Sequence, residues 1–173
     1  MIRDIQKVDN DICEAKRKIK EVLYSDPDII EILHNPKLDP EVPDEYLNKN
    51  IFGYIRIPDT ITDVMNYICF DISQKRISEA NSIMKEQYYM FYVYSHEDDI
   101  STPYGLERHD LLAYLIIDLF NYSNMFGTQL QLVSNIPGVM DSHYSSRCLT
   151  FKAVDTNSIN RGVTTNRYEF RNR

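Results

Sequence analysis

The stretch LERHDLLAYLIIDLFNYSNMF, residues 106–126, decides the fold that the sequence predicts. Its apolar side chains recur at helical spacing over about five turns, and Glu107 in the first turn suits the helix dipole. Pro103 and Gly105 precede the predicted start of the helix, and Gly127 can adopt the left-handed conformation that commonly ends a helix. We therefore predict one long helix. Its sheet-facing side chains are expected to be Leu112, Leu115, Ile116, Leu119 and Phe120.

A second apolar strip on this helix widens its buried surface. Leu111, Tyr114 and Ile117 lie on the flanks of the predicted sheet-facing side. An isolated surface helix does not need so broad an apolar band. We expect either the N-terminal helix or a neighbouring subunit to cover this flank.

The rest of the chain predicts an α+β fold with a mostly antiparallel sheet of about four to five strands, on which the long helix packs. The segments 2–24 and 28–34 read as helices. The first carries a heptad-like seam, expected to pack on its own domain, with a short coiled coil as the alternative. Alternating or apolar runs predict strands at 51–57, 65–72, 87–96, 128–134 and 147–154. The intervening segments 73–86 and 135–146 are expected to be long loops. The helical seam is formed by Ile5, Val8, Ile12, Ala15, Ile19 and Val22.

Composition divides the chain into three parts. Residues 1–35 form an N-terminal helical segment, 36–155 the α+β core, and 156–173 an extended basic tail rich in Asn, Thr and Arg. At 173 residues the chain is expected to be one domain with appendages. No apolar run is long enough to span a membrane, and no hydrophobic signal core begins the sequence. Three scattered cysteines, Cys13, Cys69 and Cys148, are expected to be reduced, in a cytosolic setting.

Catalytic signatures are weak in this sequence. His96, Asp98, Asp99 and His109 could be assembled into a metal site, but their spacing matches no known signature. A nucleophilic cysteine would need a base and an electropositive setting, and only Arg147 beside Cys148 hints at one. There is no glycine-rich phosphate loop and no nucleophile elbow. We therefore expect no enzymatic activity, no cofactor and no bound metal.

Charge and aromatic content point instead to protein contacts. The net charge of −7 argues against broad affinity for phosphate backbones. The 13 tyrosines and 7 phenylalanines fit subunit interfaces as well as sheet faces. A basic tail on an acidic body would allow head-to-tail contacts between identical subunits, and such contacts close into rings.

Several segments resemble the tail terminator (tail completion, or head–tail joining) neck proteins of tailed bacteriophages and prophages of Gram-positive bacteria. The likeness covers roughly residues 20–160. It is carried by YGLERHDLL from Tyr104, IIDLFN from Ile116, LQLVSN from Leu130, the strand ending HEDD at residues 96–99, and the closing Arg147-x-Leu-x-Phe strand.

This resemblance implies a non-enzymatic virion protein of the tail or neck, assembled in the host cytoplasm. It implies a hexameric ring that caps the tail tube, contacts tail-tube (and possibly sheath) protein, and meets the head connector or stopper. DNA would pass through the lumen without specific binding, and no cofactor or membrane is involved. Two alternatives stay open: another neck component on the portal side, or a small intracellular metal protein or enzyme. Candidate subunit or tube contacts are Tyr114, Ile117, Arg147, Arg161, Arg167, Tyr168, Phe170 and Arg171.

Overall fold

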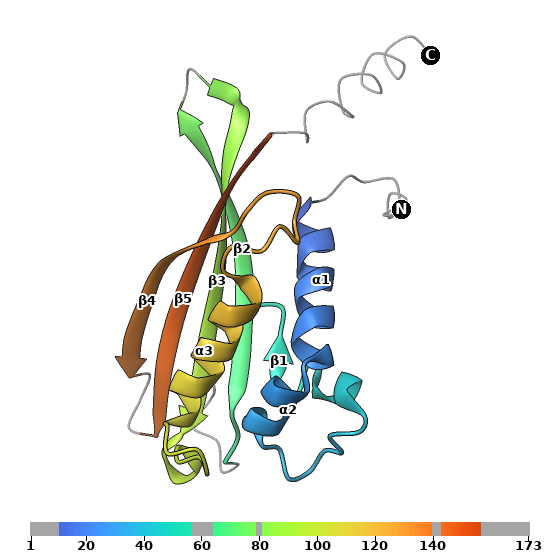
Figure 1. Cartoon of the computed structure of the whole chain (residues 1–173), viewed down its shortest axis with the longest axis vertical. Coiled ribbons are helices and arrows are strands. Elements are labelled where there is room, and N and C mark those ends of the chain that lie inside the picture. Colours follow the sequence, from blue (N-terminus) through green and yellow to red (C-terminus); the bar gives the residue numbers. More distant parts are fainter. Residues whose placement is uncertain (1–10, 57–63, 79–80, 140–142, 157–173) are drawn as a thin grey trace.

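The computed structural model describes residues 11–56, 64–78, 81–139 and 143–156 and has an α+β fold, which confirms the predicted class (Figure 1). Its five strands belong to one sheet. The elements are α1 (Asp11–Ser25), α2 (Pro27–Leu33), the 3-10 helix η2 (Pro43–Tyr46), β1 (Ile51–Phe52), β2 (Tyr67–Ser78), β3 (Asn81–His96), the 3-10 helix η3 (Glu97–Asp99), α3 (Arg108–Phe120), β4 (Gln131–Val139) and β5 (Tyr144–Thr156).

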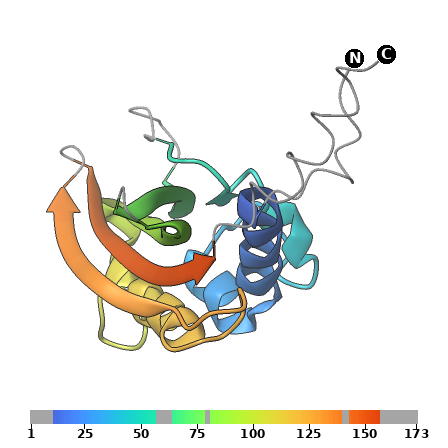
Figure 2. The ribbon, with the colours of Figure 1, turned by 90° about the horizontal axis from the view of Figure 1, so that it is seen from above.

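The sheet has the strand order β1-β2-β3-β5-β4. Only the β1–β2 pair is parallel, and the other three pairs are antiparallel. The strand predicted at 87–96 is the C-terminal part of β3, which lies in the middle of the sheet. Seen from above, β4 and β5 bend past the helices (Figure 2).

The main core lies between the helices and one face of the sheet. Helix α3 contacts β3 and β5, whereas α1 contacts β1 and β2. Alternation in the strands directs one set of side chains into this core. The buried set includes Ile19 and Leu23 from α1, Ile29 and Leu33 from α2, Leu112, Ile116 and Phe120 from α3, and Ile68, Phe70, Phe91, Val93, Leu149 and Phe151 from the strands.

The opposite face of the sheet carries a smaller cluster at one end. Phe52, Tyr67, Cys69, Tyr94 and Tyr144 are buried together there. The guanidinium of Arg56 lies over the Phe52 ring, 5.0 Å from its centroid, and the Cys69 thiol donates to the Arg56 carbonyl at 3.8 Å. Tyr67 and Cys69 of β2 therefore belong to a second core on this face of the sheet.

The long helix is shorter than predicted at both ends. It begins at Arg108 and ends at Phe120, not at 106 and 126. Tyr122 turns into the left-handed region at φ 60°, and its amide donates to the Leu130 carbonyl at 2.8 Å. The Asn121 side chain accepts from the Leu132 amide at 3.0 Å. The helix ends early because these bonds turn the chain toward β4, so Gly127, at φ 90°, lies in the connecting loop and does not cap the helix.

The two long loops predicted at 73–86 and 135–146 are wrong. Strands β2 and β3 continue through most of the first segment, with Ser73 paired to Tyr88 and Lys75 to Glu86. Strands β4 and β5 likewise continue through most of the second segment, with Asn135 paired to Leu149. Polar composition misled the prediction, because a strand ladder is made by backbone groups and an exposed ribbon needs no apolar side chains.

The described part of the first predicted helix packs on its own domain, as expected. Ala15 and Ile19 are buried, while Ile12 and Val22 are partly buried against the core. Ile5 and Val8 lie outside the described residues. Helix α2 lies within one residue of its predicted range. It starts at Pro27 because the Asp26 carboxylate accepts hydrogen bonds from the amides of Asp28 and Ile29.

Within the chain, the apolar flank of α3 is covered by a different helix from the one expected, and coverage by a neighbouring subunit stays a prediction. Helix α2, rather than α1, packs against α3. Leu111, Leu115 and Ile117 are partly buried, and Tyr114 stays exposed. Leu115 and Leu119, predicted to be in the sheet-facing set, are also only partly buried. No helix among the described residues is long and apolar enough to cross a membrane.

Candidate functional site

Arg108, the first residue of α3, connects this helix to α2 and η3. Its buried guanidinium donates to the Ile32 carbonyl at 2.6 Å and to the Asp99 carbonyl at 2.6 Å. It also pairs with the Asp99 carboxylate at 2.8 Å. The same carboxylate accepts a hydrogen bond from the side-chain amide of Asn66 at 2.8 Å and lies 3.0 Å from a ring nitrogen of His34. A charged group buried with this many partners holds α2 in a defined position against α3.

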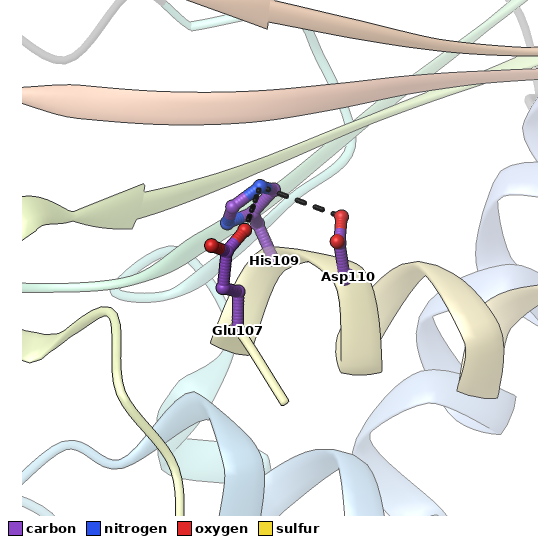
Figure 3. Close-up of side chains that lie close together, drawn as sticks. All are labelled: Glu107, His109 and Asp110. Carbon is purple, nitrogen blue, oxygen red and sulfur yellow. Dashed lines mark ion pairs between the residues drawn. The ribbon is translucent and has the colours of Figure 1, made fainter. Parts of the chain in front are cut away.

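The first turn of α3 holds a second polar cluster (Figure 3). His109 Nε2 lies 3.6 Å from a Glu107 oxygen and 3.4 Å from an Asp110 oxygen. Asp110 also accepts a hydrogen bond from Arg147 Nε on β5, and this bond lowers the pKa of Asp110 below its usual value. The same contact raises the pKa of Arg147. The pair ties α3 to β5 across the main core.

Three ligand atoms of this cluster lie within 4.8 Å of one another, from Glu107, His109 and Asp110. A divalent cation could be accommodated by such a set. However, Asp110 is already bound by Arg147, whose fixed positive charge opposes a second cation at the same oxygen. The geometry therefore favours an ion pair between Arg147 and Asp110 over a metal centre.

The metal set assembled from the sequence is not brought together. His96 accepts from the Asp98 amide at 3.2 Å and stacks on His143. Asp99 belongs to the Arg108 network, and His109 belongs to the Asp110 cluster. Of the four side chains, only His96 and Asp98 lie close together, with His96 Nδ1 3.6 Å from an Asp98 carboxylate oxygen, whereas Asp99 and His109 lie in separate environments.

A surface pocket of about 210 Å³ lies between α2 and α3. Ile32, Leu111 and Leu115 supply its apolar wall, and Asp28 and Glu31 supply carboxylates. Tyr104, which is 59% exposed, closes one side and donates to Glu31 at 2.5 Å. This hydrogen bond raises the pKa of Tyr104. Among the described residues that line it, none is Lys or Arg. The pocket suits a ligand that is cationic and partly apolar.

Strand β4 forms an open edge of the sheet. It pairs with β5 on one side and has no strand on the other among the described residues. Val133, Ile136 and Val139 are 56%, 57% and 79% exposed. Exposed edges with large apolar side chains favour pairing with another chain, and natural proteins usually block them. Pro137 and the irregularity in register between Leu132 and Ser134 both weaken such pairing.

The contact residues predicted from the sequence have different surroundings in the structure. Tyr114 is 64% exposed and adjoins the pocket residues Leu111 and Leu115 along α3, while Ile117 is partly buried. Arg147 forms the intramolecular pair with Asp110. The remaining candidates, Arg161, Arg167, Tyr168, Phe170 and Arg171, lie outside the described residues.

Sequence reasoning missed the β4 edge and the acidic pocket. Ile136 and Val139 fell within a predicted loop, although a proline within an apolar run is typical of an edge strand. In the sequence, Asp28 and Glu31 look like ordinary exposed polar residues of a short helix. No local pattern identifies the pocket, because it exists only where α2 packs on α3.

Comparison with known proteins gives one family. The family model YomW matches residues 19–153, which include the second half of α1 and β5 as far as Ala153. No match to a curated protein was found. The matched range contains strands β1 to β4, β5 as far as Ala153, the Arg108 network and the pocket.

Proposed function

The chain belongs to the YomW family, a phage-derived family, and from this premise we propose that it is a tail terminator. In this role it is a non-enzymatic structural protein of the virion neck. Copies assemble into a ring, a hexamer by the resemblance to neck proteins, that ends tail-tube polymerisation and joins the tail to the head.

The observation that carries the proposal is the open β4 edge. Val133, Ile136 and Val139 present apolar side chains on an edge that has no strand partner among the described residues. A protein that remained monomeric would expose an aggregation site at this edge. Pairing with a neighbouring subunit or with tube protein would satisfy the backbone and cover the side chains.

The opposite edge of the sheet supports a ring rather than a closed dimer. Strand β1 pairs with β2 only at Ile68 and Cys69. Beyond those residues, the outer edge of β2 has no strand partner in the described part of the chain. Two different edges on opposite sides of one subunit allow a heterologous contact, and repetition of such a contact closes a ring when the rotation permits.

The charge of the chain fits the passage of DNA through such a ring. A net charge of −7 keeps nonspecific contacts with phosphates weak. An acidic lumen would let the genome move without being held. The proposal therefore has tube, sheath or connector proteins as partners, and DNA only as transient contents.

The test combines mass measurement with tube capping. Mass photometry of the purified chain, alone and with tail-tube protein of the same phage, should show a ring species. Electron microscopy should show that substoichiometric amounts of the chain arrest tube elongation at one end. A strict monomer that never binds tube ends would overturn the proposal.

Matched variants assign the effect to the β4 edge. Ile136→Asp and Val139→Lys should abolish ring formation and capping, because a charge on the edge opposes strand addition. Val42→Lys introduces the same kind of change at an exposed apolar residue outside the sheet and should have no effect. Rings that bind portal-side connector protein but not tube protein would reassign the chain to the other neck ring.

A further inference from the structure

We propose that the pocket between α2 and α3 of one copy binds the basic, aromatic segment 157–173 of a second copy. The pocket is defined by Asp28, Glu31, Ile32, Tyr104, Leu111 and Leu115. This inference rests on the proposed function to the extent that both require contacts between identical subunits. It specifies which surface and which segment make one of them.

The chemistry of the two surfaces is complementary. Segment 157–173 has four arginines and one glutamate and therefore a net charge of +3. Because the whole chain carries −7, residues 1–156 carry −10. Arginine pairs well with the carboxylates of Asp28 and Glu31. Tyr168 and Phe170 lie between Arg167 and Arg171 in the sequence and suit an apolar wall.

Two exposed tyrosines add to this match. Tyr104 borders the pocket, and Tyr114 follows Leu111 by one helical turn. A guanidinium over a tyrosine ring gains a cation–π contribution. Asp118 lies one further turn along this side of α3 and is exposed, which extends the acidic surface beyond the pocket.

The segment starts far from the pocket of its own copy. Strand β5 ends at Thr156, which pairs with Met84 near the start of β3. The pocket lies at the other end of the sheet, because His34 at the end of α2 contacts Asp99, just past His96 at the end of β3. The twelve steps from Met84 to His96 correspond to roughly 40 Å of extended strand. The segment therefore begins far from the pocket of its own copy and at the opposite end of the molecule (Figure 1).

A charge-swap experiment tests the contact. The pocket variant carries Asp28→Lys and Glu31→Lys, and the segment variant carries Arg167→Glu and Arg171→Glu. Each alone should raise the concentration needed for assembly by roughly tenfold or more, because attraction becomes repulsion. Glu41→Lys with Asp44→Lys makes the same change in net charge at exposed residues away from the pocket and should leave assembly unchanged.

Mixing the two variants distinguishes copies from a single chain. In an equimolar mixture each reversed segment meets a reversed pocket, and each normal segment meets a normal pocket. Assembly measured by sedimentation velocity should recover if the contact joins two copies. If the mixture stays dissociated while one chain carrying all four changes assembles, the segment folds back on its own copy and the proposal is wrong.

Peptide binding separates this inference from the proposed function. A fluorescent peptide of residues 157–173 should bind the full chain in an anisotropy titration, and more weakly by roughly tenfold with the pocket variant. Circular dichroism checks that the variant is folded. If the wild-type protein caps tubes but the peptide binds both proteins equally or neither, only this inference fails. If the peptide binds the pocket but no ring or capping occurs, only the tail-terminator function fails.

Discussion

Arg108 is the residue whose loss should cost the folded state most among the polar side chains. It is buried, with partners on the Ile32 and Asp99 carbonyls and on the Asp99 carboxylate. Arg108→Leu removes the guanidinium and leaves the Asp99 carboxylate with Asn66 and His34 as its remaining side-chain partners. We expect a loss of about 3–5 kcal/mol in the free energy of unfolding, measured with urea. Arg108→Lys should recover only part of it, since a lysine cannot reproduce the planar set of donors.

The Asp110–Arg147 pair predicts a pH dependence of stability. The hydrogen bond from Arg147 lowers the pKa of Asp110 in the folded chain, relative to about 3.9 when unfolded. The contribution is therefore fully present above the unfolded pKa and is lost as the pH falls through the folded pKa. Asp110→Asn should reduce the acid-side slope of unfolding free energy against pH. The loss at neutral pH should be at most about 1 kcal/mol, since the pair is partly exposed.

Arg147→Gln is the matching control for that measurement. It removes the partner of Asp110 while leaving the carboxylate in place. The two variants should show the same reduced slope between pH 5 and pH 3, and an unchanged slope in either would contradict the assignment.

Cys69 is predicted to be the least reactive of the three thiols. Burial raises its pKa to about 11, so very little thiolate exists at neutral pH. Cys13 is exposed on α1. A thiol reagent at pH 8 should modify Cys13 and leave Cys69 intact until denaturant is added, as read by peptide mass spectrometry. Rapid modification of Cys69 in the native protein would contradict its burial.

At the scale of the element, α3 should derive its stability from the side that faces the sheet. Phe120 is fully buried and contacts the rings of Phe91 and Phe151. Phe120→Ala should therefore cost about 3–5 kcal/mol of unfolding free energy. Leu115 is only partly buried beside the pocket, so Leu115→Ala should cost less than about 2 kcal/mol. Equal losses in urea denaturation would mean that both positions are core positions.

At the scale of the whole molecule, folding and assembly should respond differently to changes at the β4 edge. Ile136→Asp alters an exposed side chain and should change the unfolding free energy of the subunit by less than about 0.5 kcal/mol. The same variant should prevent ring formation under the proposed function. Urea unfolding and mass photometry on one preparation give both values. Loss of folding along with assembly would show that β4 is stabilised mainly within the subunit.

The sequence by itself determined the α+β class and some of the side chains that enter the main core. Helical spacing identified Leu112, Ile116 and Phe120, because the helical period follows directly from backbone geometry. It also placed α2, whose start is set by the carboxylate of Asp26 capping nearby amides. These features depend on neighbours in the chain.

Only the tertiary structure decided where α3 ends, how far the strands run, and which polar residues meet. The end at Phe120 depends on Leu130 and Leu132, and the polar ribbon of β2 and β3 depends on ladder bonds between strands. The pocket, the Arg108 network and the open β4 edge arise from residues far apart in the chain. Local periodicity reports the face that a segment buries, but it cannot report which other segment covers that face.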